Sequence, residues 1–265
     1  MTKFVFILFA FIAPFSSIKS QDVINQTDAK GYKQGKWINK YPGGTIRYEG
    51  SFVDDRPVGE WKRFHENGKL KAHLFHVPNT DKVAAELYDS EGILYAKGNY
   101  IKTVKDSTWK YFNKQKLVGQ EDFSLGLRNG RSMTYFEDGK PASESVWVNG
   151  ELNGVSRSFF PSGSKKTEIM YRNGKRNGAS LVYYESGIQE IVGFYIDDNA
   201  DGTWKFQDEN SNLKYELKYK TGVLLNPEVV DSLQDKEFKT FDRAKGLLKD
   251  PADYIGNPEE YMRQK

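Results

Sequence analysis

The sequence has no cysteine, only nine prolines and no apolar run longer than ten residues in 265 positions. The lack of cysteine excludes a disulfide framework, a thiolate metal site, a cysteine nucleophile and a lipidated N-terminal cysteine. The short apolar runs exclude a polytopic membrane protein, because a transmembrane helix needs about 20 apolar residues. Hydrophobic residues make up 38% and mean hydropathy is -0.70, yet aromatic residues reach 14%. Burial must therefore rest on Tyr, Phe and Trp, and the chain should fold.

The first twenty residues have the layout of a secretory signal peptide. Lys3 precedes ten apolar residues, and a short polar segment then ends at Ser20. We predict a signal peptide over residues 1–20, with an uncleaved anchor as the alternative, and a mature chain that begins at Gln21. Such a chain is exported and is periplasmic, associated with the outer envelope, or secreted. Without Lys3 and Lys19 the formal charge falls from +3 to +1, so we expect no nucleic-acid partner.

A period of 24 residues runs through the middle of the chain. Its leading position, most often glycine, recurs in steps of 24 residues, or 23 once, at Gly35, Gly59, Val83, Ser107, Gly130, Gly154, Gly178 and Gly202. Four of the five tryptophans lie two residues after a leading position, and in most copies an aromatic residue follows three residues later. A turn glycine comes next, and apolar and polar residues then alternate, which is typical of a half-buried strand. Each copy is therefore predicted to form a β-hairpin.

The first strand of each hairpin should be irregular. A tryptophan at offset two and an aromatic residue at offset five cannot both lie on one face of a flat strand, because side chains alternate between faces. We therefore predict a bulge or a strong twist between these two positions. The sequence alone does not assign the faces.

The repeated pattern resembles a known family. The spacing G-x-W-x-x-[FY]-x-x-x-G, followed eight residues later by an aromatic residue and joined by N-G-x-x-N-G loops, is similar to the bacterial variant of the MORN repeat over about residues 31–222. The resemblance implies successive β-hairpins in a long meander and a scaffold, not an enzyme, that engages proteins or membrane lipids. Bacterial members are often labelled antitoxin-like.

These observations predict a mainly β fold. We expect an open antiparallel meander of about eight 24-residue hairpin repeats with a C-terminal α-helical tail. The predicted divisions after the signal peptide are an N-terminal lead-in over residues 21–34, the repeat array over 35–225 and the helical tail over 226–265.

The tail pairs capping residues with proline at three predicted helix starts, at Asn226, Asp250 and Asn257. An amphipathic helix cannot bury its apolar stripe alone. The stripe either covers the last hairpin or the aromatic face of the sheet, or it binds a partner or a second copy. From Pro227 the tail carries nine acidic and seven basic residues, which argues against a membrane surface. The candidate partner-binding residues are Val230, Leu233, Phe238, Phe241 and Leu248.

One segment fits the start of a calcium-binding loop. Asp197, Asn199 and Asp201 follow the pattern D-x-N-x-D-G, with Asp208 at the twelfth position in place of the usual glutamate. The same segment coincides in register with the loop at 173–178, so a plain polar turn also explains it. Metal is otherwise not predicted.

Two aromatic sets complete the candidates. All three histidines, His65, His73 and His76, lie in one hairpin, but residues 73 and 76 should point to opposite faces of a strand, so solvated or core roles are expected.

A ladder of aromatic residues recurs near the end of the second strand of each hairpin and either packs the sheet or stacks on sugar rings. The ladder comprises Phe52, Tyr100, Trp147, Tyr171, Tyr195 and Tyr219.

No catalytic motif or cofactor-binding motif is present in the sequence: it contains neither a phosphate-binding loop nor a nucleophile elbow. We predict an exported, non-enzymatic scaffold without a cofactor that binds an unidentified envelope or secreted protein. The alternative is a module that binds envelope glycans or lipid headgroups.

Overall fold

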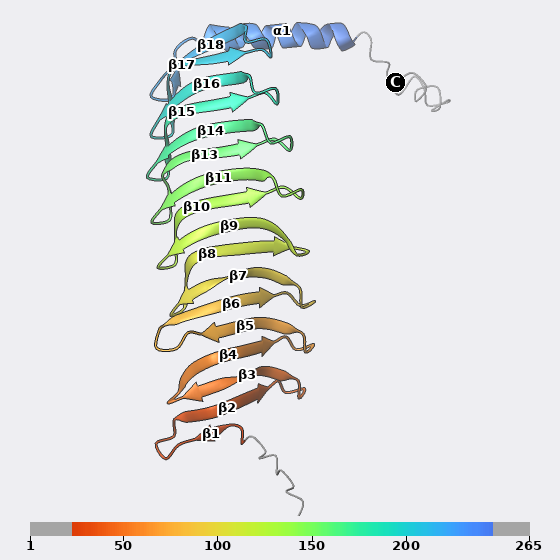
Figure 1. Ribbon diagram of the computed structural model, residues 1–265. Helices are drawn as coiled ribbons and strands as arrows, with labels where there is room; N and C mark the ends of the chain where they lie inside the picture. The colour runs from red at the N-terminus through yellow and green to blue at the C-terminus, as the bar shows by residue number, and fades with distance from the viewer. Residues whose placement is uncertain (1–22, 246–265) are drawn as a thin grey trace, which may run out of the picture.

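The computed structural model describes residues 23–245 and the side chains of residues 23–236. This part of the chain forms one long antiparallel sheet followed by a single helix, α1 (Pro227–Lys245) (Figure 1). The predicted signal peptide and the helix starts predicted at Asp250 and Asn257 lie outside the described residues. The strands are β1 (Gln26–Thr27), β2 (Lys33–Lys40), β3 (Ile46–Val53), β4 (Arg56–Phe64), β5 (Leu70–His76), β6 (Lys82–Tyr88), β7 (Leu94–Ile101), β8 (Val104–Asn113), β9 (Lys116–Ser124), β10 (Leu127–Tyr135), β11 (Pro141–Val148), β12 (Glu151–Leu152), β13 (Gly154–Phe159), β14 (Lys165–Arg172), β15 (Lys175–Tyr183), β16 (Gln189–Ile196), β17 (Asn199–Gln207), β18 (Leu213–Lys220) and β19 (Val223–Leu224).

The sheet is a meander in which each strand except β12 pairs with the next strand in sequence. β12 and β13 both pair with β11, so they act as one interrupted strand. β1, β12 and β19 have two residues each, and the other sixteen strands have six or more. The predicted open array of eight hairpin repeats with a helical tail is confirmed.

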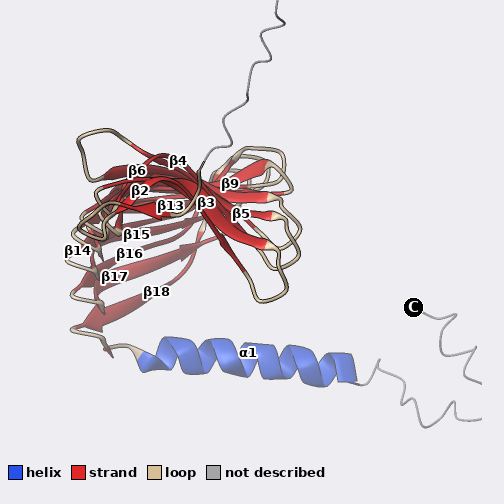
Figure 2. Ribbon diagram, turned by 90° about the horizontal axis from the view of Figure 1, so that it is seen from below, coloured by secondary structure: helices blue, strands red, loops and turns tan. Residues whose placement is uncertain are grey.

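Two kinds of turn alternate along the array. At one end of the strands, two-residue turns place both central residues at positive φ, as at Asp54 (50°) and Asp55 (61°). Such turns match the right-handed twist of the strands that they join. At the other end, longer loops close on a glycine such as Gly68 (φ 82°), whose N–H donates to the carbonyl of His65 at 2.9 Å. The twist accumulates, and the strands at the two ends of the array run in clearly different directions when viewed along it (Figure 2).

The predicted irregularity lies just before the offset-five aromatic residue. The register shifts between Arg63 and Phe64, and equivalent shifts recur along the array. The shift separates the aromatic residues: the offset-two tryptophans lie on one face, whereas Tyr135 contacts Met133 on the other. We call the face that bears Trp61 the aromatic face and the opposite face, which bears Lys62 and Glu144, the charged face.

The core is a thin layer on the aromatic face. Trp109 is fully buried, and Ala85 and Ala96 beside it are 3% and 2% exposed. Since no second layer covers the sheet in the described part of the chain, the aromatic side chains bury one another.

The tail begins at the C-terminal edge of the sheet with Asn226, and the predicted helix-capping role of its side chain is wrong. Asn226 was predicted to cap the helix with its side chain, but its Oδ1 accepts from the N–H of Lys218 and its Nδ2 donates to the carbonyl of Glu216. The side chain thus caps β18, because edge strands present unpaired backbone groups that an amide can satisfy. Asn25 does the same at the other edge, with both bonds to Ile38.

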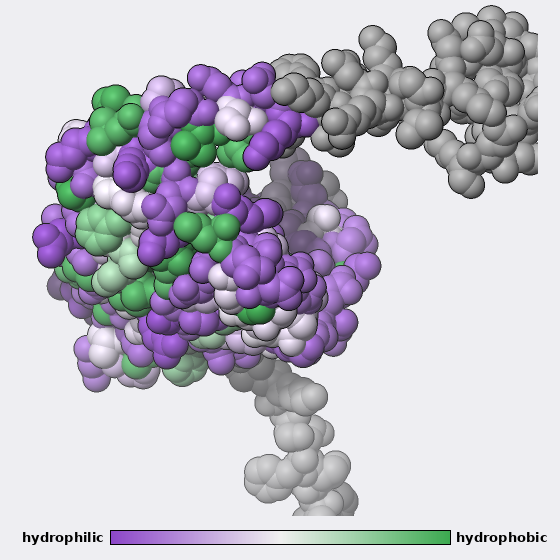
Figure 3. Space-filling model, turned by 90° about the horizontal axis from the view of Figure 1, so that it is seen from above, coloured by the Kyte–Doolittle hydropathy of each residue, from purple (hydrophilic) through white to green (hydrophobic). Residues whose placement is uncertain are grey.

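α1 contacts β18 and then extends past the end of the strands, across the top of the array (Figures 1 and 2). This end of the molecule is largely hydrophilic, with hydrophobic patches between the polar side chains (Figure 3). Within residues 23–245, no helix combines the length and the apolar character needed to cross a bilayer.

Candidate interaction surfaces

The aromatic ladder lies on the aromatic face, one residue per hairpin. Phe52 is 9% exposed and meets Trp61 edge-on, with ring centroids 4.8 Å apart. Tyr100 meets Trp109 at 4.8 Å, and Tyr195 meets Trp204 at 4.9 Å. Most of the ladder is half-buried by these contacts, which favours a packing role. The ladder residues that the sequence predicted are Phe52, Tyr100, Trp147, Tyr171, Tyr195 and Tyr219.

Two further residues complete the ladder. His76 pairs across the strands with Val83, and Val83 pairs in turn with Tyr100. The ring centroids of His76 and Trp61 are 6.1 Å apart. Phe123 lies opposite Ser107 beside Trp109. The fixed spacing of the repeat could have identified both residues. In the other six copies an aromatic residue lies 17 residues after the leading position; His76 lies at the same distance, and Phe123 lies at 16 residues.

Three tryptophans lie flat over a glycine of the preceding strand. A Cβ built on Gly50, Gly98 or Gly193 would lie 2.2–2.4 Å from a tryptophan ring atom, so no side chain fits there. Indole N–H groups then reach the backbone: Trp61 donates to Ser51 at 3.1 Å and Trp109 to Asn99 at 2.9 Å. The Trp204 Nε1 is buried without a hydrogen-bond partner.

Basic side chains cover the ladder at a repeated position, two residues before the leading residue. Lys105 Nζ lies 4.7–5.1 Å from the ring centroids of Trp109, Tyr111 and Phe123, and burial beneath these rings lowers the pKa of its ammonium group. Burial also raises the pKa of the Tyr111 phenol, with a further contribution from its hydrogen bond to Glu121. The other basic residues at this position are Lys33 over Phe52, Arg128 over Trp147 and Arg176 over Tyr195, so four of the eight copies have such a cover.

A groove of about 770 Å³ opens on the aromatic face over β3–β7. The third repeat has Ala85 where four other copies have tryptophan. Leu74 stands eleven residues earlier, where three of those four copies have the glycine beneath the tryptophan. Without a third indole between Trp61 and Trp109, space remains above the strands. The walls and rim include Tyr48, Phe52, Trp61, Arg63, Lys71, His76, Asp89, Tyr100 and Lys102.

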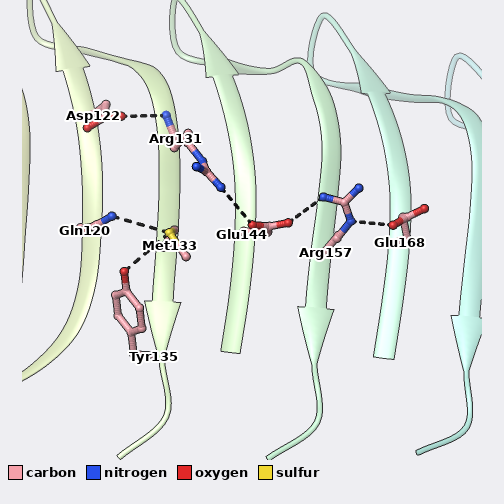
Figure 4. A network of polar contacts seen from close by, with 8 residues as sticks. All are labelled: Gln120, Asp122, Arg131, Met133, Tyr135, Glu144, Arg157 and Glu168. Carbon is pink, nitrogen blue, oxygen red and sulfur yellow. Dashed lines mark hydrogen bonds and ion pairs between the residues drawn. The ribbon is translucent and has the colours of Figure 1, made fainter. Parts of the chain in front are cut away.

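The charged face carries a network of ion pairs in the middle of the array. Arg157 bonds Glu144 at 2.7 Å and Glu168 at 2.6 Å, and Arg131 reaches Glu144 at 3.4 Å (Figure 4). Glu144, Arg157 and Glu168 lie directly across neighbouring strands, whereas Arg131 pairs with Val146 and reaches Glu144 diagonally. The hydrogen bond from Arg157 holds the pKa of Glu168 below its usual range, and both carboxylates raise that of Arg157.

Beside this network the charged face becomes apolar. Val146, Met170 and Phe194 are 38%, 42% and 44% exposed. Cross-strand pairing joins Val155 to Met170 and Ala179 to Phe194. We call these five residues, which run from β11 to β16, the apolar strip.

The calcium candidate forms a polar turn. Asp197 Oδ1 accepts from Asn177 at 3.0 Å, and Asn199 donates to the carbonyl of Asp197. Asp201 accepts from the N–H of Thr221 at 2.9 Å and pairs with Lys220 at 3.6 Å. Within the described residues no group of three or more His, Asp or Glu side chains is placed to hold a metal ion.

The three histidines have separate partners. His65 Nε2 lies 3.1 Å from the carbonyl of Tyr88, and His73 pairs with Glu60 on the charged face at 2.8 Å. His76 lies on the aromatic face, where burial and then the nearby Arg63 charge lower its pKa. Residues 73 and 76 point to opposite faces, as predicted.

The predicted partner-binding stripe of the tail is described only in part. Val230 and Leu233 are half-buried at the start of α1. The side chains of Phe238 and Phe241, and the whole of Leu248, lie outside the described residues.

Comparison with known proteins identifies the repeat. Four segments, residues 33–54, 57–77, 152–173 and 200–221, match the family model described as MORN repeat variant. Each begins two residues before a leading position and contains one hairpin. No curated protein matches the chain.

Among solved structures, a mutant of TarM from S. aureus in complex with fondaparinux, alpha-GlcNAc-glycerol and UDP is 11% identical to the chain. The match covers 45% of this chain and 19% of that chain, with a TM-score of 0.21. A likeness this weak supports no conclusion on fold or function.

Proposed function

The chain is a protein of MORN-variant repeats, and from this premise we propose that it is an exported, non-enzymatic scaffold that binds a protein of the cell envelope or extracellular space. MORN repeats fit a repeat scaffold that mediates protein interactions. The export part of the proposal is supported by the sequence of residues 1–20, in which a basic residue precedes a ten-residue apolar run.

The apolar strip carries the proposal. Val146, Met170 and Phe194 expose apolar side chains on every second strand, with Val155 and Ala179 between them, on a face whose other side chains are mostly polar. The Arg131–Glu144–Arg157–Glu168 network borders them. An apolar centre with a charged rim is the usual composition of a protein–protein interface. The expected partner therefore presents an apolar surface with charges at its margin.

Affinity capture from envelope fractions tests the proposal. The bait is the tagged mature chain, and the strip variant carries Met170→Glu and Phe194→Glu. We expect the wild-type chain to recover one polypeptide in stoichiometric amount and the strip variant to lose it, because each new carboxylate would be desolvated in the interface.

The matched control is Phe75→Glu, which alters an exposed aromatic residue (47%) of the same face outside the strip. It should capture the partner as the wild-type chain does. Equal capture by the strip variant would contradict the proposal. Retention on purified cell-wall material or lipid, with no protein recovered, would instead support the glycan or headgroup alternative.

A further inference from the structure

The groove on the aromatic face is basic. Arg63, Lys71 and Lys102 are exposed at its lining and make no ion pair within residues 23–236. The carboxylate at the groove, Asp89, accepts the backbone N–H groups of Glu91 and Ile93, both at 2.9 Å. Its oxygen is engaged by its own loop, and the groove lining carries three cations against this one carboxylate. An anionic occupant with aromatic or aliphatic side chains would suit both the charges and the rings.

The chain itself contains a segment of that chemistry. Residues 250–262 carry four carboxylates and no lysine or arginine. Tyr254 and Ile255 follow the first two of these acids, and Tyr261 follows the last two. The preceding basic residue is Lys249 and the following one is Arg263, so the acidic character is confined to this stretch.

The start of the segment stays far from the groove of its own chain, so the segment as a whole cannot bind there. Twelve strand-to-strand steps separate β5, in the groove, from β18, where α1 begins, a distance of about 58 Å at ~4.8 Å per step. α1 runs across the end of the array and not back along it (Figure 1). From Lys245 to residue 250, five residues span at most about 18 Å. The occupant must therefore come from another molecule.

We propose that residues 250–262 of one copy bind in the basic aromatic groove of a second copy. The carboxylates pair with Arg63, Lys71 and Lys102, and the tyrosines lie against the rings of the groove. Two copies that exchange tails in this way close a dimer. The proposal does not depend on the proposed function, because it uses the opposite face of the sheet.

Sedimentation of the full mature chain tests the proposal by charge exchange. The groove variant carries Arg63→Glu and Lys102→Glu, and the tail variant carries Glu259→Lys and Glu260→Lys. We expect a dimer for the wild-type chain and at least a tenfold weaker dimer for each variant alone, on the order of the coupling seen for close interfacial charges. An equimolar mixture of the two variants should regain dimer through the restored groove-to-tail pairing, and the chain that combines both changes should be dimeric.

The control variant carries Lys36→Glu and Lys218→Glu on exposed positions away from the groove and should remain dimeric. Circular dichroism checks that every variant keeps the sheet. A monomeric wild-type chain, or a dimer that neither variant weakens, would overturn the proposal. A dimer that both variants leave unchanged, together with loss of anionic-glycan binding in the groove variant alone, would identify a glycan as the occupant and would overturn the proposal.

Discussion

At the scale of single residues, the side chains at two positions eleven residues apart are complementary in size: a large tryptophan lies over a glycine. Gly98 lies beneath Trp109, and the same pairing recurs twice more. Where alanine replaces the tryptophan, at Ala85, Leu74 fills the place of the glycine. The glycine is therefore needed for the space above it and not for its backbone freedom, since Gly98 has an ordinary φ.

Substitution Gly98→Ala should destabilise the protein. The added Cβ would lie 2.4 Å from the Trp109 ring, which is fully buried and hydrogen-bonded to Asn99. Overpacking of this kind costs about 1–3 kcal/mol, so the urea midpoint should fall. The control is Gly43→Ala, where no atom lies within 4 Å of the new Cβ and φ is not positive. Equal midpoints for the two variants would show that the stacking contributes nothing.

The sequence predicts the position of single residues correctly where the spacing alone determines the sheet face on which a side chain lies. The alternation after each turn glycine placed Tyr195 and Tyr219 on one face correctly. The predicted ladder lacks His76 and Phe123, because histidine is often a polar residue and because a one-residue deletion places Phe123 sixteen instead of seventeen residues after its leading position. The flat contact of tryptophan on glycine could not be predicted, since it depends on the register that the bulges set.

At the scale of elements, the sheet is closed at both edges by an asparagine side chain. Asn25 bonds the N–H and the carbonyl of Ile38, and Asn226 bonds Lys218 and Glu216. An amide supplies one donor and one acceptor, as a backbone unit does. The sequence predicted the start of the helix at this point, but the proline pattern could not show that the amide would turn to the sheet.

Substitution Asn226→Ala should open the C-terminal edge. The Lys218 N–H loses its acceptor, so its hydrogen exchange should become faster by at least about tenfold, the equivalent of a lost bond of about 1.4 kcal/mol. The exposed edge should also promote association of chains, measured by light scattering. Asn210→Ala is the matched control, because only the backbone N–H of Asn210 forms a bond in its hairpin loop. Unchanged exchange at Lys218 would show that the amide does not protect the edge.

At the scale of the whole molecule, the strand contacts within residues 23–245 lie mainly between sequence neighbours. Constant spacing therefore sufficed to predict the number and order of the hairpins. The groove and the position of α1 could not be predicted in this way, because they depend on which face a missing tryptophan exposes and on how the tail leaves the last strand. A one-dimensional array should tolerate the loss of a whole unit if the contacts across the new junction are kept.

Two deletions of 24 residues test this modularity. Removal of residues 155–178 leaves Trp204 above Gly193, so we expect a folded sheet with a modestly lower urea midpoint. Removal of residues 179–202 deletes that glycine and brings Ile169 to the position eleven residues before Trp204, where the indole then meets a branched side chain. The second deletion should be less stable by about 1–3 kcal/mol, the usual cost of overpacking. Circular dichroism and urea titration of both chains measure the difference. Equal midpoints would mean that repeats combine without regard to the residue pairs at their junctions, and failure of the first deletion to fold would mean that the array is not modular.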